Sequence, residues 1–138
     1  MILFIDDEKR YVKNYIEELE EGKEGEEVGF EVNYINNVGN ALEFIKSEES
    51  KKIEAIVLDI MMPSNGFFAD DEVEIGIQFY NECRKHFPDT KVFVLTNVSR
   101  EDVREFFEKQ KDCYFDRKDD IMPVEFAKKV YQELRKRG

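Results

Sequence analysis

The sequence IEAIVLDIMMP, residues 53–63, carries the clearest signal of the fold. Its first six residues form a short, mostly apolar run that predicts a strand. The run ends on Asp59, so a carboxylate is expected where this strand emerges from the core. An irregular loop from Ile60 to Glu72 should follow, because it contains Pro63 and an Asn65-Gly66 turn signal.

Apolar runs and amphipathic stretches alternate on both sides of this strand. We expect further strands at residues 2–5, 30–34, 91–95 and 113–115. We expect helices at residues 8–21, 40–48 and 73–87, and two more that begin at Ser99 and Pro123. Five β-α repeats predict one α/β domain over residues 1–138. It should be a flavodoxin-like, doubly wound, five-stranded parallel sheet of order 2-1-3-4-5, with helices on both faces.

Composition and charge exclude several classes of function. The 138 residues carry 32 acidic against 21 basic side chains, a net charge of −11. Binding to nucleic acid or to an anionic membrane is therefore not expected, because both need clustered Lys and Arg. Cys83 and Cys113 lack the spacing of a metal or redox pair and suit a reducing compartment. With no apolar run of ~20 residues and no signal peptide, we expect a cytoplasmic protein.

Polar side chains follow three of the expected strands. Asp6 and Asp7 come after the first strand, Asp59 after the third, and Thr96 after the fourth. Ligands of an open parallel sheet bind beyond the carboxyl ends of its strands, where the first and third strands would be neighbours. Two carboxylates ~4 Å apart repel by about 4 kcal/mol at an effective dielectric near 20. A divalent cation would relieve this repulsion, and an oxygen-rich site that also takes phosphate suits Mg²⁺.

The motifs FIDDE (4–8), IVLDIMMP (56–63) and VLT (94–96), with a lysine after the last strand, resemble response regulator receiver domains of two-component signalling. The resemblance spans essentially the whole chain and includes Pro63. It implies that Asp6, Asp7, Asp59 and the backbone carbonyl of Met61 hold Mg²⁺.

The resemblance also implies a function. Asp59 would accept a phosphoryl group from a histidine kinase or a histidine phosphotransfer protein, while Thr96 and Lys118 contact that group. Such a phosphoprotein is a phosphorelay component and not an enzyme, apart from its own phosphotransfer and autodephosphorylation. We expect no output domain on this chain, so its output would be a contact with a downstream protein through the last two helices and the last strand. A homodimer is possible.

The chain departs from the receiver pattern at several positions. The usual aromatic-x-x-Lys-Pro motif is replaced by YFDRKD (114–119), so either Arg117 or Lys118 could fill the lysine position, and we favour Lys118. Asn97 stands where receivers usually carry a small residue, which could slow turnover of the phosphorylated form. The loop from Ile60 to Glu72 is longer than usual and is either a variable surface insertion or a segment that docks a partner or covers the site.

Two other functions compete with this interpretation. A receiver-like interaction module could signal without phosphorylation, although a scaffold has no need for clustered carboxylates. A phosphatase that forms an aspartyl-phosphate would carry a second aspartate at position 61, where this chain has Met61.

Overall fold

The computed structural model of the protein describes residues 1–21, 29–61 and 72–135. The strands are β1 (Ile2–Ile5), β2 (Val32–Ile35), β3 (Ala55–Leu58), β4 (Lys91–Thr96) and β5 (Cys113–Arg117). The helices are α1 (Lys9–Glu21), α2 (Val38–Ile45), α3 (Glu72–His86), α4 (Glu101–Glu108) and α5 (Pro123–Arg135). Two short 3-10 helices, η1 (Glu48–Lys52) and η2 (Lys118–Asp120), precede β3 and α5.

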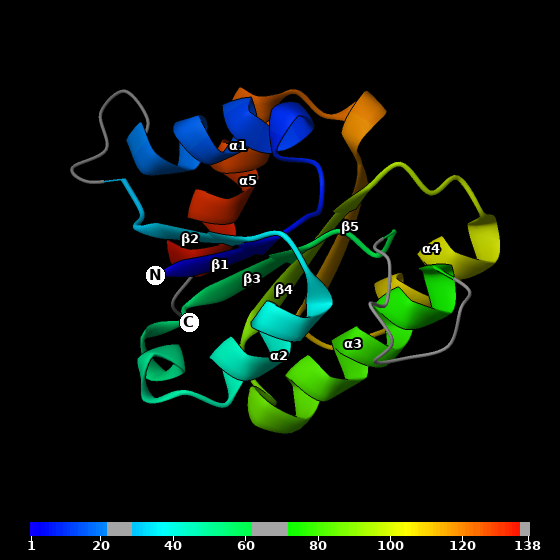
Figure 1. The fold of residues 1–138 in the computed structure, drawn as a ribbon. Helices are drawn as coiled ribbons and strands as arrows, with labels where there is room; N and C mark the ends of the chain where they lie inside the picture. The colour runs from blue at the N-terminus through cyan, green and yellow to red at the C-terminus, as the bar shows by residue number, and fades with distance from the viewer. Residues whose placement is uncertain (22–28, 62–71, 136–138) are drawn as a thin grey trace.

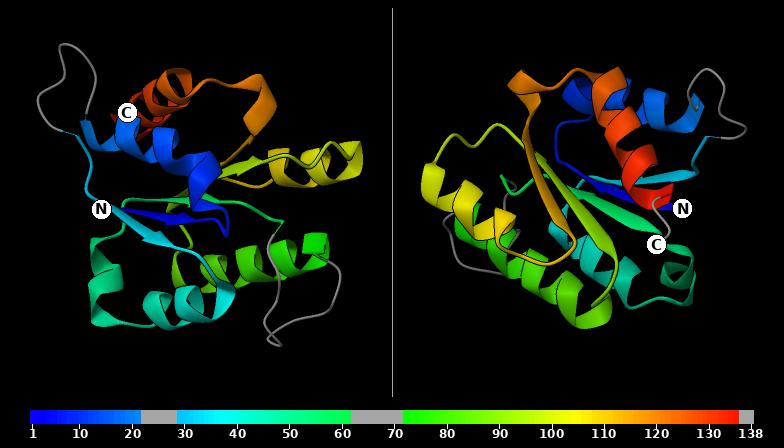
Figure 2. Two further views of the ribbon diagram at one scale, coloured as in Figure 1. Left: turned by 45° about the horizontal axis from the view of Figure 1, so that its top comes forward. Right: turned by 180° about the vertical axis from the view of Figure 1, so that it is seen from behind.

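The five strands form one parallel sheet of order β2-β1-β3-β4-β5, which confirms the predicted topology (Figure 1). The helices cover both faces of this sheet (Figure 2): α1 and α5 lie on one face, and α2, α3 and α4 lie on the other. β1 and β3 are direct neighbours, with Ile5 opposite Leu58. Their carboxyl ends therefore meet at the same edge of the sheet.

The sequences of the central strands are unbroken apolar runs because these strands lie in the core. Every residue of β1 and β3 is buried, because helices pack on both faces of the sheet. β2 is the outermost strand on its side and is only half-buried, which agrees with its mixed polar and apolar pattern. In the described part of the chain, no helix has the length and apolar character needed to cross a membrane.

Several element boundaries differ from the sequence predictions. α2 begins two residues early, at Val38, because the side chain of Asn37 accepts a hydrogen bond from the Asn40 amide and caps the helix. The prediction that Ser99 opens the next helix was wrong. Arg100 is the N-cap of α4, and it pairs with Asp102 at 2.8 Å.

Gly76 allows α3 to pack closely against the chain that leaves β3. A Cβ atom at this position would overlap the Cβ, Cα and carbonyl oxygen of Ile60, which is fully buried. Because two of these atoms belong to the backbone, the overlap cannot be relieved by rotating a side chain. The absence of a side chain at Gly76 thus lets α3 pack directly on the segment that follows Asp59.

We expect Gly76→Ala to lower the free energy of unfolding by about 1–3 kcal/mol, the usual cost of overpacking, despite the higher helix propensity of alanine. Chemical denaturation of the variant and the parent measures this difference. Gly39→Ala in α2 is the matched control, because Gly39 is also helical but only half-buried. Equal or greater stability of Gly76→Ala would contradict the close packing.

Candidate functional site

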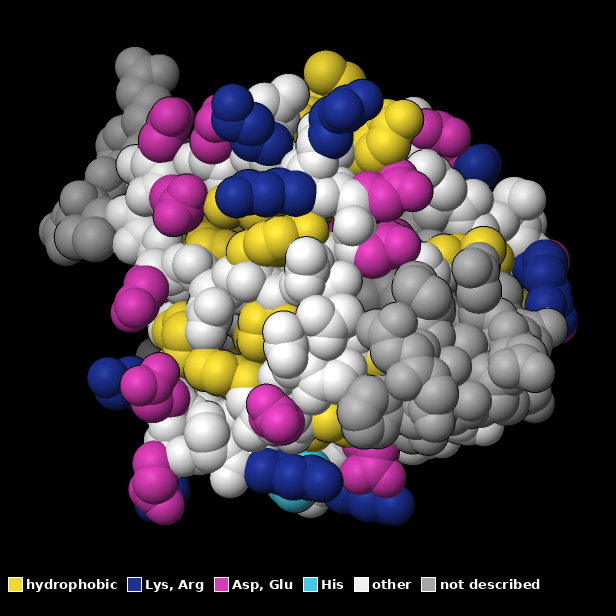
Figure 3. All heavy atoms as spheres, in the orientation of Figure 1, with side chains coloured by type: hydrophobic (Ala, Val, Ile, Leu, Met, Phe, Trp, Pro, Cys, Tyr) yellow, Lys and Arg dark blue, Asp and Glu magenta, His cyan; other side chains and the backbone are white. Residues whose placement is uncertain are grey.

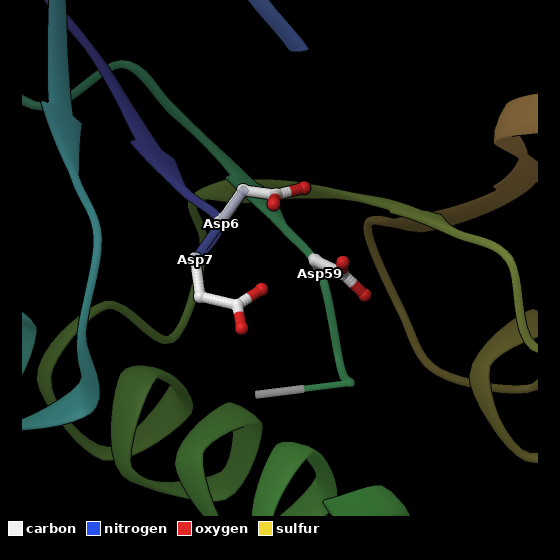
Figure 4. Close-up of side chains that lie close together, drawn as sticks. All are labelled: Asp6, Asp7 and Asp59. Carbon is white, nitrogen blue, oxygen red and sulfur yellow. The ribbon is translucent and has the colours of Figure 1, made fainter. Parts of the chain in front are cut away.

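Three carboxylates gather at the carboxyl ends of β1 and β3. Oxygens of Asp6, Asp7 and Asp59 all lie within 4.8 Å of one another. Figure 4 shows Asp6 and Asp7 at the tip of β1, with both carboxylates directed toward the side on which Asp59 lies. The sheet order explains this convergence, since β1 and β3 are hydrogen-bonded neighbours and the Asp59 amide donates to the Ile5 carbonyl at 3.0 Å.

Asp59 is held by hydrogen bonds to both of its carboxylate oxygens. The hydroxyl of Thr96, at the end of β4, donates to Asp59 Oδ1 at 2.7 Å, and the Met61 amide donates to the same oxygen at 2.9 Å. Lys118 Nζ donates to Asp59 Oδ2 at 2.9 Å. Asp59 and Thr96 are both buried. These contacts bring together four residues that the sequence analysis placed at one site.

Lys118 connects the two strand tips. Its ammonium group lies 2.7 Å from Asp6 Oδ2 and 2.9 Å from Asp59 Oδ2, and its side chain is only 10% exposed. The neighbouring Arg117 instead lies 3.6 Å from Asp119 and 3.8 Å from Asp120. The structure therefore brings Lys118, and not Arg117, to the candidate site.

A cleft of about 210 Å³ opens beside Asp59. Asp7, Asp59 and Lys118 line it, whereas Asp6 is 1% exposed and lies behind it. The other lining residues are Glu8, Met61, Asn97 and Val98. The cleft is the size of a small anion with a few waters, and Asp7 and Asp59 present oxygens to it.

The electrostatics of the cluster are dominated by burial and mutual repulsion. Burial, with repulsion from Asp59, raises the pKa of Asp6 from its ordinary 3.8 to about 7, although Lys118 acts in the opposite direction. The pKa of Asp7 is also raised, chiefly by burial and then by Asp59. Burial disfavours the charged form of Lys118, but attraction to Asp59 and Asp6 outweighs it and raises the pKa of Lys118. The site is thus short of positive charge.

The donor set fits a hard divalent cation. Three carboxylates against one ammonium group leave a formal charge of −2 when all are ionised. Carboxylate oxygens and waters are the ligands that Mg²⁺ prefers. Asp7 and Asp59 would be its ligands in the cleft, with Asp6 behind them. The Met61 amide contacts Asp59, while the use of its carbonyl as a metal ligand stays a prediction.

Two tyrosines outside the cleft fix the backbone of the site and were missed by the sequence analysis. Tyr34 on β2 donates its hydroxyl proton to the backbone carbonyl of Asp6 at 2.6 Å. Tyr15 on α1 lies 3.0 Å from the Lys118 carbonyl and 2.6 Å from the Ile121 carbonyl. Both tyrosines matched the apolar pattern of their elements, and that pattern gives no sign of a backbone carbonyl partner distant in sequence.

Other sequence predictions have different outcomes. Asn97 is exposed and lines the cleft, as its position after Thr96 suggested. Pro63 and most of the long loop predicted from Ile60 to Glu72 lie outside the described residues.

The raised pKa of Asp6 predicts a pH dependence of stability. Between about pH 4 and pH 7 the folded protein keeps a proton on Asp6 that the unfolded chain releases, so stability falls as pH rises through this window. Without divalent cations, Asp6→Asn should therefore gain about 2–3 kcal/mol over the parent between about pH 5 and about pH 8.

Denaturant melts of both proteins in a chelating buffer measure this gain. Asp89→Asn is the control, because the Asp89 side chain is 86% exposed and should give the same difference from the parent at both pH values. A difference between Asp6→Asn and the parent that does not change with pH would contradict the account of the acidic cluster.

Comparison with known proteins supports the same fold. No family model matches the chain, and no curated protein matches it. A receiver domain protein from Methanospirillum hungatei is 20% identical, with a TM-score of 0.72 over 96% of this chain and 91% of that one. A Francisella receiver domain is 21% identical, with a TM-score of 0.73 over 97% and 95% of the two chains.

A receiver domain protein from Clostridium thermocellum is 22% identical, with a TM-score of 0.72 over 96% of this chain and 92% of that one. At these identities the likeness establishes the fold and leaves the chemistry to the residues described above. The chain has the fold of a response regulator receiver domain.

Proposed function

We propose that this protein is a phosphoacceptor receiver in two-component or phosphorelay signalling, in which Asp59 takes up a phosphoryl group in a Mg²⁺-dependent reaction. The observation that carries the proposal is the arrangement around Asp59. One carboxylate is held by the hydroxyl of Thr96 and the ammonium of Lys118, in a cleft that a second carboxylate, Asp7, also lines. A scaffold would gain nothing from such repulsion between carboxylates.

The residues divide the work of phosphoryl transfer. A carboxylate oxygen of Asp59 attacks the phosphorus of a phosphohistidine in line, the P–N bond breaks, and the imidazole leaves with its electron pair and takes up a proton. Lys118 offsets the charge on the transferred oxygens, which is the main task of a protein in this chemistry. Thr96 turns its hydroxyl from Asp59 toward the new phosphoryl group.

Asp7, Asp59 and the carbonyl of Met61 would bind the Mg²⁺ directly, and the carboxylate of Asp6, which lies behind the cleft, would add negative charge that helps to hold the ion. When bound, the ion would supply positive charge that stabilises the transferred phosphoryl group. Asp7 faces the cleft directly, and Asp6 keeps Lys118 in place from behind.

The signal would pass from Thr96 to β5. Thr96 pairs with Arg117 in the sheet, two residues beyond Phe115. The Phe115 ring is buried, stacks on Phe107 of α4 with centroids 6.1 Å apart, and lies 5.5 Å from the Arg104 guanidinium. Phosphorylation would favour one arrangement of these groups and so change the α4–β5–α5 face that a downstream protein contacts.

The fold of the compared structures is consistent with this role. One of them, 21% identical with a TM-score of 0.70, is described as a BeF3-activated receiver domain of DrrB. We propose a histidine kinase or a histidine phosphotransfer protein as the phosphodonor and the cytoplasm as the location. Whether the chain pairs with a second copy stays a prediction.

Incubation with acetyl phosphate and Mg²⁺ should add one phosphoryl mass to the intact protein, and peptide mapping should place it on Asp59. Chelation of Mg²⁺ or the substitution Asp59→Asn should abolish the adduct. A folded protein that never forms the adduct, even with a panel of histidine kinases, would favour the interaction module that acts without phosphorylation.

The same assay separates Lys118 from Arg117. We expect Lys118→Met to slow adduct formation by roughly 10-fold or more, because it removes the cation beside Asp59. Arg117→Met should react at nearly the parental rate, since its guanidinium faces Asp119 and Asp120. Thermal melts of both variants test whether each is folded. The reverse order of effects would show that the lysine position is filled by Arg117.

A further inference from the structure

A second hollow lies at the outer edge of the sheet, between β2 and the α2–η1 segment. Its volume is about 480 Å³, more than twice that of the cleft beside Asp59, and the two share no lining residue. Figure 3 shows hydrophobic side chains at the surface over β2 and α2, with acidic side chains around them. We call this hollow the β2 groove; its lining residues include Asn33, Ile35, Glu43 and Phe44.

One wall of the β2 groove is an open strand edge. Among the described residues, β2 pairs only with β1. The carbonyls of Glu31 and Ile35 accept hydrogen bonds from β1, so the backbone groups of Val32 and Tyr34 face outward by the alternation of a parallel ladder. β2 reads VNYI and contains neither a charged residue nor a proline, which are two common protections of sheet edges.

The groove offers an apolar floor and an acidic rim. Ile35 and Phe44 are partly buried and pack on the core beneath. Glu43 and Glu49 are exposed, and neither forms an ion pair with a residue that the structure describes. Glu48 lies 2.7 Å from Lys51, so the rim keeps two unpaired negative charges.

We infer that the β2 groove binds an extended segment of a partner protein in which basic and aliphatic residues alternate at every second position, so that both kinds point to the same face. The segment would lie along β2 as a sixth strand and form hydrogen bonds with the backbone of Val32 and Tyr34. Side chains of one parity would reach over the groove, because alternate residues of a strand point to the same face. An aliphatic side chain fits against Ile35 and Phe44.

Charge selects the partner. Basic side chains two positions from the aliphatic anchor point to the same face and would meet Glu43 and Glu49, whereas an acidic segment would be repelled. The carboxamide of Asn33 lies on the groove face of the same strand, where it can donate to and accept from an extended backbone. The groove is therefore built to recognise a peptide backbone, an apolar side chain and a positive charge together.

The test titrates ¹⁵N-labelled protein with a blocked peptide about ten residues long, in which lysine and valine alternate at every second position and serine fills the positions between them. Shift changes should centre on Val32, Tyr34 and the α2–η1 segment. The double substitution Glu43→Gln with Glu49→Gln should weaken binding about tenfold. The matched control, Glu101→Gln with Glu125→Gln, changes net charge equally at exposed sites on α4 and α5 and should bind like the parent.

Five outcomes would overturn the inference. Equal weakening by both double substitutions would reduce the binding to general attraction by an acidic protein. Equally tight binding of the same peptide with serine in place of valine would show that the apolar floor is not used. Shift changes centred elsewhere, no binding, or pairing of β2 with a second copy would exclude a partner segment. Asp59→Asn should bind the peptide normally, so this test is independent of phosphorylation.

Discussion

The candidate site depends on two ion pairs that are made by one group, the ammonium group of Lys118. It lies between Asp6 and Asp59, two carboxylates that come from different strands and are almost completely buried. Buried charges are costly unless they are paired, and here one cation faces three acidic side chains. The ion pairs of Lys118 therefore link the tips of β1 and β3, but its single positive charge does not neutralise the three carboxylates.

The order of the strands in the sheet brings these acidic side chains together. Because β1 and β3 are parallel neighbours, the residues that follow them emerge side by side, and β4 adds Thr96 at the same edge. The β5–η2 junction then carries Lys118 back over the strand tips. Tyr15 holds this junction through the Lys118 carbonyl, and Tyr34 holds the chain at Asp6. The acidic cluster at the tips of β1 and β3 is thus fixed by contacts from four further elements, β2, β4, η2 and α1.

Much of this could be predicted from the sequence, because buried parallel strands are apolar runs and the polar residue that ends each run marks the functional edge. The choice between Arg117 and Lys118 could not be decided in that way. The two residues are adjacent, and the outcome depends on where β5 ends: the strand continues through Arg117, and the turn to η2 begins at Lys118.

The first turn of α4 shows a different limit. Ser99 is the better cap by preference, yet Arg100 occupies the N-cap and pairs with Asp102. The hydrogen bonds of Tyr15 and Tyr34 could not be predicted from the sequence either, since their acceptors are backbone carbonyls 103 and 28 residues away along the chain. The local pattern of apolar residues predicts which side chains are buried, whereas hydrogen bonds to distant carbonyls depend on how distant segments of the chain pack together.

We propose that the acidic cluster of Asp6, Asp7 and Asp59 binds a divalent cation, because Lys118 leaves its negative charge incompletely neutralised. Crystals grown with Mn²⁺, which suits the same oxygen ligands as Mg²⁺, test it directly through the anomalous difference map. We predict one peak in the cleft, bonded to Asp7 and Asp59. A map with no peak there, at a Mn²⁺ concentration that occupies other surface carboxylates, would contradict the claim.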